Sequence, residues 1–213
     1  MTDTARDDAP GRYLALNCTL KRSPERSSTD RLLGYVTGLL DHAGLSGSTL
    51  RVVDHDVAFG VSDDEGDGDG WPEIRRSVLD SDLLVLGTPI WLGHPASVCQ
   101  VVLERLDAMI TETDDRDQQV LVDKLALLAV VGNEDGAHHV GAELQQGLND
   151  VGFTFPPGAM TYWVGEAMGR TDLIDLDEIP DCTASTARTM VTNAVHLLRR
   201  LRGEGAYPRL PEE

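Results

Sequence analysis

The fold is decided by the stretch LVLGTPIWLGHPASVCQVVLERLD, residues 84–107. It begins as an apolar strand, passes through a Thr-Pro step, and then becomes amphipathic with helical spacing. A short apolar run followed by such a helix is the repeating unit of a parallel sheet with helices on both faces. A turn needs no apolar surface such as Ile90 and Trp91, so this connection also predicts contact with a flat, partly apolar ligand.

The same alternation recurs on both sides of this stretch. Apolar segments predict strands over 12–18, 48–54, 82–88, 124–132 and 159–165. Apolar residues at helical spacing predict helices over 28–44, 71–80, 95–110, 139–152 and 183–202. Five such units predict an α/β fold with a five-stranded parallel sheet of order 2-1-3-4-5. We expect residues 12–202 to form this one domain, with a disordered N-terminal tail over 1–11 and a C-terminal tail over 203–213.

Composition limits the class of ligand and partner. The chain has 36 Asp and Glu against 18 Lys and Arg, a formal charge of −18, which repels nucleic acid and anionic lipid. Three cysteines without a CxxC pair, and no secretory signal or long apolar run, predict a cytoplasmic protein without disulfides. The histidines are scattered and the acidic stretch 62–70 is interpreted as a solvated loop, so no metal is expected.

Ligands of such sheets sit outside the carboxyl ends of the strands, where the strand order reverses. Three loops reach that edge, and the first, TLKRSPERSST at 19–29, is rich in hydroxyl groups and cations. A helix cap explains one hydroxyl but leaves the others, so we interpret the loop as a phosphate site. The loop is neither a P-loop nor GxGxxG, which argues against a nucleoside triphosphate or a dinucleotide. Its candidate binding residues are Thr19, Lys21, Ser23, Ser27, Ser28 and Thr29.

The second and third loops suit the ring of the ligand. Two interpretations of the second stay open: Trp91 covers the end of the sheet, or it contacts a flat ligand. The third, GNEDG, is either a turn that caps the next helix or a set of amides and side chains that meet the same ring. The candidates are Thr88, Pro89, Ile90, Trp91, Leu92 and Gly93 in the second loop and Gly132, Asn133, Glu134, Asp135 and Gly136 in the third.

Taken together, the three loops resemble those of the flavodoxin-like NAD(P)H-dependent FMN reductase and quinone reductase family. The Ser-rich first loop, the Thr-Pro-Ile-aromatic-x-Gly pattern at 88–93 and the Gly-rich turn at 132–136 carry the resemblance, which spans about residues 12–200. Trp91 stands where relatives often have tyrosine, and the acidic pair Glu134 and Asp135 is a second departure. The resemblance implies FMN with its phosphate in the first loop and its ring between the other two.

The resemblance also implies the chemistry. Hydride passes from NAD(P)H to the flavin and on to a quinone-like or other small acceptor, and the cofactor does the bond-making. No catalytic side chain is therefore expected, although Glu134 and Asp135 should lower the reduction potential of a nearby flavin. The alternatives are a one-electron carrier of flavodoxin type and a flavin-free binding protein. Family members usually pair, so a homodimer or homotetramer is expected, with no nucleic-acid or membrane partner.

Overall fold

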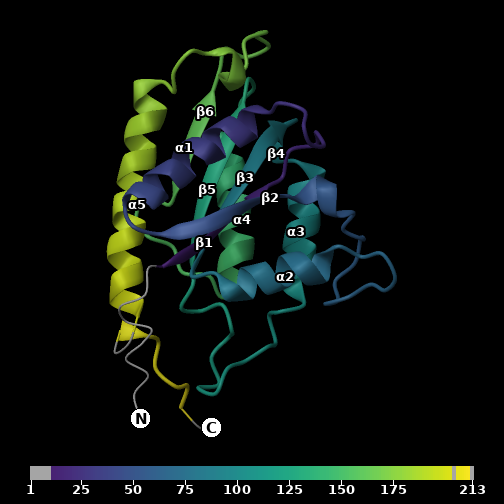
Figure 1. The fold of residues 1–213 in the computed structure, drawn as a ribbon, viewed down its shortest axis with the longest axis vertical. Coiled ribbons are helices and arrows are strands. Elements are labelled where there is room, and N and C mark those ends of the chain that lie inside the picture. Colours follow the sequence, from purple (N-terminus) through teal and green to yellow (C-terminus); the bar gives the residue numbers. More distant parts are fainter. Residues whose placement is uncertain (1–10, 203–204, 212–213) are drawn as a thin grey trace.

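A computed structural model describes residues 11–202 and 205–211 of the chain. Strands and helices alternate along it, as the sequence predicts (Figure 1). The strands are β1 (Arg12–Asn17), β2 (Ser46–Arg51), β3 (Leu83–Trp91), β4 (His94–Pro95), β5 (Leu125–Gly132) and β6 (Met160–Val164). The helices are α1 (Ser28–His42), α2 (Trp71–Asp80), α3 (Ser97–Asp107), α4 (Ala137–Asp150) and α5 (Asp181–Leu201), with short 3₁₀ turns at Val52–His55 and Leu173–Asp175.

The sheet has the order β2-β1-β3-β5-β6, and these strands are all parallel. Leu16 in β1 pairs with Leu50 on one side and with Leu86 on the other. This is the predicted 2-1-3-4-5 arrangement of a flavodoxin-like α/β fold, which is thereby confirmed. The short β4 is additional and pairs antiparallel with the end of β3.

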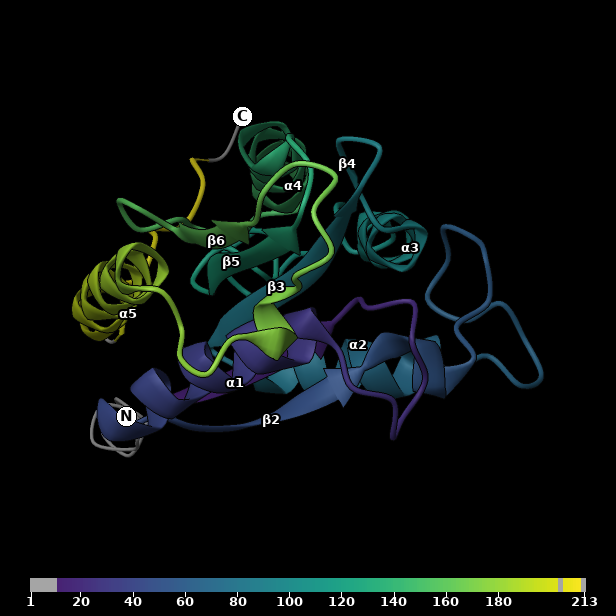
Figure 2. The same cartoon turned by 90° about the horizontal axis from the view of Figure 1, so that it is seen from above.

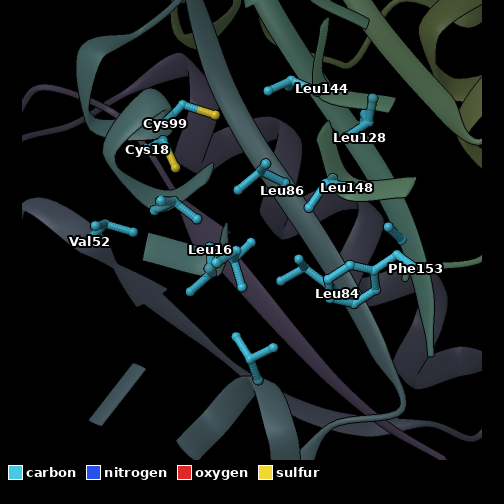
Figure 3. Packing of buried hydrophobic residues seen from close by; sticks show 14 of the residues in the cluster. Leu16, Cys18, Val52, Leu84, Leu86, Cys99, Leu128, Leu144, Leu148 and Phe153 are labelled. Carbon is cyan, nitrogen blue, oxygen red and sulfur yellow. The ribbon is translucent and has the colours of Figure 1, made fainter. Parts of the chain in front are cut away.

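Helices cover both faces of the sheet (Figure 2). One apolar cluster joins the sheet to α2, α3 and α4, and a second joins the opposite face to α1 and α5. Figure 3 shows the first cluster, in which Leu84, Leu86 and Leu128 of the strands meet Leu144 and Leu148 of α4. Both faces of the central strands are buried, which explains why their sequences are apolar without alternation.

The three cysteines differ in burial. Cys18 and Cys99 are buried side by side in the first cluster, Cys182 is exposed, and all three thiols are free (Figure 3). Burial raises the pKa of the Cys18 thiol, and the neighbouring Cys99 raises it further. The raised pKa of Cys18 is the opposite of what a reactive cysteine needs.

Two segments differ from the sequence-based expectation. The second strand begins and ends earlier than predicted, because residues 52–55 turn into a 3₁₀ helix. The acidic stretch 62–70 is exposed over 62–68, but the Asp69 side chain is buried and pairs with the buried Arg105 at 2.7 Å. Burial would raise the pKa of Asp69, but hydrogen bonds from Arg105 and three backbone amides hold it well below its ordinary value. Arg105 also donates to the carbonyls of Ala58 and Ser62, so one buried cation orders this loop.

The tail predicted over 1–11 lies outside the described residues except for Gly11, as do residues 203, 204, 212 and 213 of the C-terminal tail. The described part of that tail packs on 114–123, where the Tyr207 amide donates to Asp123 at 2.9 Å. Within the described residues, no helix combines the length and apolarity that crossing a membrane requires.

Candidate functional site

A cavity of about 510 Å³ opens at the carboxyl ends of the parallel strands. Four connections line it: those that follow β1, β3, β5 and β6. They gather at the upper end of the sheet in Figure 1. A larger hollow of about 850 Å³ lies in the groove between α1 and α5, away from this edge. We place the candidate site in the smaller cavity because it occupies the position where parallel sheets bind ligands.

The connection after β1 forms a fixed turn at the start of α1. Asn17 is fully buried; its amide donates to Asp30 at 3.0 Å and its side-chain oxygen accepts from the Thr19 amide at 3.1 Å. The Ser27 hydroxyl caps α1 by accepting from the Asp30 amide at 3.0 Å. The amides of Ser28 and Thr29 belong to the first helical turn and have no partner among the described residues. Two unpaired N–H groups and the positive end of the helix dipole thus lie beside the cavity.

Charge in this connection is more balanced than its sequence indicates. Arg22 pairs with Asp56, and the Ser23 hydroxyl donates to Asp54 at 2.6 Å. That bond with Ser23 lowers the pKa of Asp54. The parallel pairing of β2 with β1 places these aspartates there, and Ser23 does not line the cavity. Lys21 does line the cavity, and it is the one cation among the lining residues in the part of the chain that the structure describes.

The connection after β3 is a tight hairpin rather than an open loop. β3 runs on to Trp91, and Trp91 pairs with His94 across a two-residue turn formed by Leu92 and Gly93. Both turn residues have positive φ, 53° and 79°, as the twist of a two-residue hairpin requires. Leucine in this conformation is strained by about 1–2 kcal/mol. Leu92 is 88% exposed and Trp91 is 55% exposed. The hairpin therefore presents apolar surface at the mouth of the cavity.

Thr88 and Gly93 support this hairpin without lining the cavity. The Thr88 hydroxyl is buried, donates to the Pro89 carbonyl and accepts from the Ala96 amide, both at 3.0 Å. It thereby joins the two ends of the hairpin. Pro89 and Ile90 do line the cavity, with Trp91 and Leu92.

The connection after β5 forms hydrogen bonds with the connections after β3 and β6. The Glu134 carboxylate accepts from the Leu92 amide at 2.8 Å and so holds the hairpin. The Asn133 amide donates to the Gly169 carbonyl at 3.0 Å and to Asp172 at 3.1 Å, in the connection after β6. Gly132, Asn133 and Glu134 line the cavity.

The two remaining candidates of this connection do not line the cavity. Asp135 is exposed to solvent, whereas the neighbouring Glu134 is partly buried in the cavity wall. Gly136 has a φ of +126°, and a Cβ at this position would lie 2.7 Å from the Cα of Gly93. Gly136 therefore allows the hairpin to pack closely against the start of α4.

The fourth wall was not anticipated from the sequence as part of the site. Trp163 at the end of β6 lines the cavity, together with Met168, Gly169, Asp172 and Ile174 of the connection that follows. Met168 is 91% exposed and has a φ of 61°. The signal that could have found this wall is topological, because β6 is parallel to β5 and must end at the same edge of the sheet.

Comparisons with known proteins identify relatives of this chain. The family model for "NADPH-dependent FMN reductase" matches residues 12–169, which include three of the four walls and the first residues of the fourth. An 8-demethyl-8-aminoriboflavin-5'-phosphate synthase of Streptomyces davaonensis is 36% identical over 198 residues, which cover 88% of this chain and 77% of that protein. A protein of Mycobacterium bovis named divalent metal cation transporter MntH is 37% identical over 202 residues, 92% of this chain. The chain spans only 30% of the length of that protein.

Solved structures show the same fold. RosB, crystallised with the intermediate 8-demethyl-8-formylriboflavin-5'-phosphate, superposes with a TM-score of 0.81 at 35% identity, covering 91% of this chain and 81% of that chain. The apo form of the NADH:FMN oxidoreductase EmoB superposes with a TM-score of 0.63 at 19% identity, covering 93% of this chain and 94% of that chain. The second likeness is evidence for the fold alone. The family match extends over most of the chain and confirms the resemblance seen in the loops, with FMN and NAD(P)H as the cofactors and an oxidoreductase as the kind of enzyme. The chain belongs to the NADPH-dependent FMN reductase family.

Proposed function

We propose that the protein uses FMN, bound in the 510 Å³ cavity, to pass a hydride from NAD(P)H to a quinone-like or other small acceptor. The observation that carries the proposal is the division of the cavity into two unlike ends. One end offers two amides that have no partner within residues 11–202 and 205–211, hydroxyl groups and a lysine, and the other offers exposed apolar side chains. FMN has the same division, with a charged phosphate at one end and a flat tricyclic ring at the other.

The phosphate end is formed by the connection after β1. The amides of Ser28 and Thr29 point outward from the first turn of α1, where the helix dipole favours an anion. The hydroxyl of Ser28 accepts a bond from the Ile174 amide at 3.2 Å and keeps its own hydrogen to donate. Lys21, Thr19 and Ser27 also line this end. A chain of charge −18 needs such local compensation to hold a phosphate.

The ring end is formed by the β3–β4 hairpin and the end of β6. Trp91 and Leu92 lie on one wall and Trp163 on another. Aromatic and aliphatic surface of this kind favours a flat ring over water. The cavity thus fits FMN in both charge and polarity.

When bound, FMN supplies the capacity to accept a hydride and to give it up again. The chain's own residues then need only to bind, orient and exclude water, and we assign no side chain to proton transfer. Glu134 is fixed in the cavity wall by the Leu92 amide. A negative charge there should lower the reduction potential of the cofactor, whereas the exposed Asp135 should have little effect.

A second candidate function follows from the relatives. The Streptomyces davaonensis protein is named for a product that is itself a modified riboflavin phosphate, and RosB was crystallised with such an intermediate. In this alternative the flavin in the cavity is the substrate rather than the cofactor. The same phosphate and ring contacts would serve both functions, so the fate of the flavin decides between them.

The deciding experiment mixes the FMN-loaded protein with NADPH and a soluble benzoquinone without oxygen. We expect NADPH oxidation that depends on both protein and quinone, while the mass of the flavin stays unchanged. Free FMN at the same concentration is the control. A parallel reaction contains oxygen and an amino acid as nitrogen donor, and a flavin of altered mass there, without quinone reduction in the first reaction, would favour the second candidate. If NADPH is not oxidised, the same protein is reduced stepwise with dithionite, and semiquinone that accumulates in that titration would favour the one-electron carrier instead.

Assembly and location are part of the same proposal. We propose a homodimer or homotetramer that works in the cytoplasm, where reduced NADPH and free thiols occur together. Sedimentation of the purified protein at several concentrations tests the first point. A monomer at every concentration would refute it.

A further inference from the structure

Two histidines and a glutamate meet beside the hairpin, outside the residues that line the cavity. His94 lies on β4, while His139 and Glu143 lie one turn apart on α4. The Nδ1 atoms of His94 and His139 lie 3.1 Å and 3.3 Å from the same Glu143 Oε1. One ligand atom from each residue can be chosen such that all three lie within 4.8 Å of one another.

These separations suit a common metal ion. Zinc binds imidazole nitrogen at about 2.0–2.1 Å and carboxylate oxygen at about 2.0–2.2 Å, usually in a tetrahedron. Two ligands at those bond lengths are then about 3.3–3.5 Å apart by tetrahedral geometry. The two nitrogen–oxygen separations in the cluster are already close to this value, so only the two imidazoles need to adjust.

We propose that His94, His139 and Glu143 form a binding site for a divalent transition-metal ion of the Zn²⁺, Cu²⁺ or Ni²⁺ class. Two imidazole nitrogens and one carboxylate oxygen are ligands that these ions prefer over Mg²⁺ or Ca²⁺. Three protein ligands leave at least one coordination position for water. The site could not be predicted from the sequence because its two histidines are 45 positions apart and neither belongs to a metal-binding motif.

The surroundings favour an accessible, exchangeable ion. The side chains of His94, His139 and Glu143 are 61%, 56% and 38% exposed, so the ion can enter without a change of fold. The two imidazole rings lie edge to face with their centroids 4.9 Å apart, so both histidines are within reach of one ion. An acidic chain also attracts cations in general.

The site joins two elements that are distant in sequence. His94 closes the hairpin that carries Trp91, and His139 lies in the first turn of α4. A bound ion would fix the hairpin to the helix, next to the contact between Gly93 and Gly136. Zinc should therefore raise the unfolding temperature, since a ligand that binds only the native state stabilises it.

Hydrogen bonds from both imidazoles to Glu143 are the alternative explanation of this cluster, and the test separates the two. Untagged, full-length protein is freed of metal by a chelator and titrated with ZnCl₂ in a calorimeter. We expect one ion per chain. Each of the variants His94→Gln, His139→Gln and Glu143→Gln should weaken binding at least about tenfold. The matched control His196→Gln changes an exposed histidine on α5 and should leave the affinity unchanged.

A second measurement keeps the proposal testable if a variant folds poorly. The electron paramagnetic resonance spectrum of the Cu²⁺-loaded wild-type protein should show nitrogen splitting from two imidazoles, and His139→Gln should remove one of them. Absence of saturable Zn²⁺ binding would overturn the proposal. Binding that all three ligand variants leave unchanged would overturn it as well.

Discussion

Replacing Trp91 by alanine should weaken the binding of FMN about 5- to 150-fold. An aromatic side chain of this size buries roughly 150–250 Å² when covered. Trp91 is 55% exposed, so about 80–140 Å² is free, and a ring lying on one face would cover about half of that. At about 25 cal/mol per Å² this contributes roughly 1–2 kcal/mol. Stacking of bases on aromatic residues gives about 1–3 kcal/mol, and we adopt that range for the fold-change.

The assay is a fluorescence titration of the flavin-free protein with FMN. Because Trp91 is exposed, its loss should change the free energy of unfolding by no more than about 0.5 kcal/mol, which urea denaturation checks. The matched control is Phe59→Ala, since Phe59 is 83% exposed and does not line the cavity. Trp91→Phe should retain most of the affinity. An affinity of Trp91→Ala within twofold of both the wild type and Phe59→Ala would refute the stacking argument.

Three further predictions concern the supports of the site and of the fold. Asp69→Asn should lower the free energy of unfolding by about 3–5 kcal/mol, because it leaves the buried Arg105 without a counter-charge, whereas the exposed Asp67→Asn should change it by about 0.5 kcal/mol or less. The pKa of Asp69 is depressed in the folded state, so its stabilisation is present above about pH 4 and is lost as the pH falls towards the folded pKa. The wild type should therefore lose more stability than Asp69→Asn between about pH 4 and pH 2 in acid titrations followed by circular dichroism. Gly136→Ala should weaken FMN binding and lower the unfolding free energy by more than about 1 kcal/mol, because its Cβ would strike Gly93 at a positive φ.

Each of these has a result that contradicts it. Equal urea midpoints for Asp69→Asn and Asp67→Asn would show that the buried ion pair does not hold the 62–70 loop. Parallel acid-unfolding curves for Asp69→Asn and the wild type would reject the pH argument. Wild-type FMN affinity in Gly136→Ala would show that the close contact between hairpin and helix is dispensable.

The sheet could be predicted from the sequence because its signal is local. Residues 84–86 and 125–131 are continuous apolar runs, and such runs between amphipathic helices are typical of strands buried on both faces. The order of the strands in the sheet followed from the number of strand–helix units and from the known folds of that size. Strand ends were less certain. The first two of residues 52–54 are valines, as in a strand, yet this segment forms a 3₁₀ helix and leaves the sheet.

The site was harder to predict because its contacts are between segments distant in sequence. The role of Ser23 depends on Asp54, which only the pairing of β1 with β2 brings within reach. Leu92 gives no hairpin signal, since positive φ is usually marked by glycine or asparagine. Trp163 looked like part of a strand, and only the position of β6 at the cavity edge gives it a place in the site.

The buried ion pair between Arg105 and Asp69 was the feature that the sequence indicated least. Arg105 lies in an amphipathic pattern where an arginine is usually solvated, and its partner Asp69 belongs to a run of acidic residues. No periodicity distinguishes Asp69 from the exposed Asp67 two positions earlier. Only the packing of α3 against the loop selects one carboxylate for burial.

The measurement that tests the central claim most directly is a parallel titration of the flavin-free protein with FMN and with riboflavin. The two ligands share the ring and differ in the phosphate. If the start of α1 and the β3–β4 hairpin hold the two ends of one ligand, FMN binds one per chain and at least tenfold more tightly than riboflavin. Equal affinities for the two, or no uptake of either, would contradict the account.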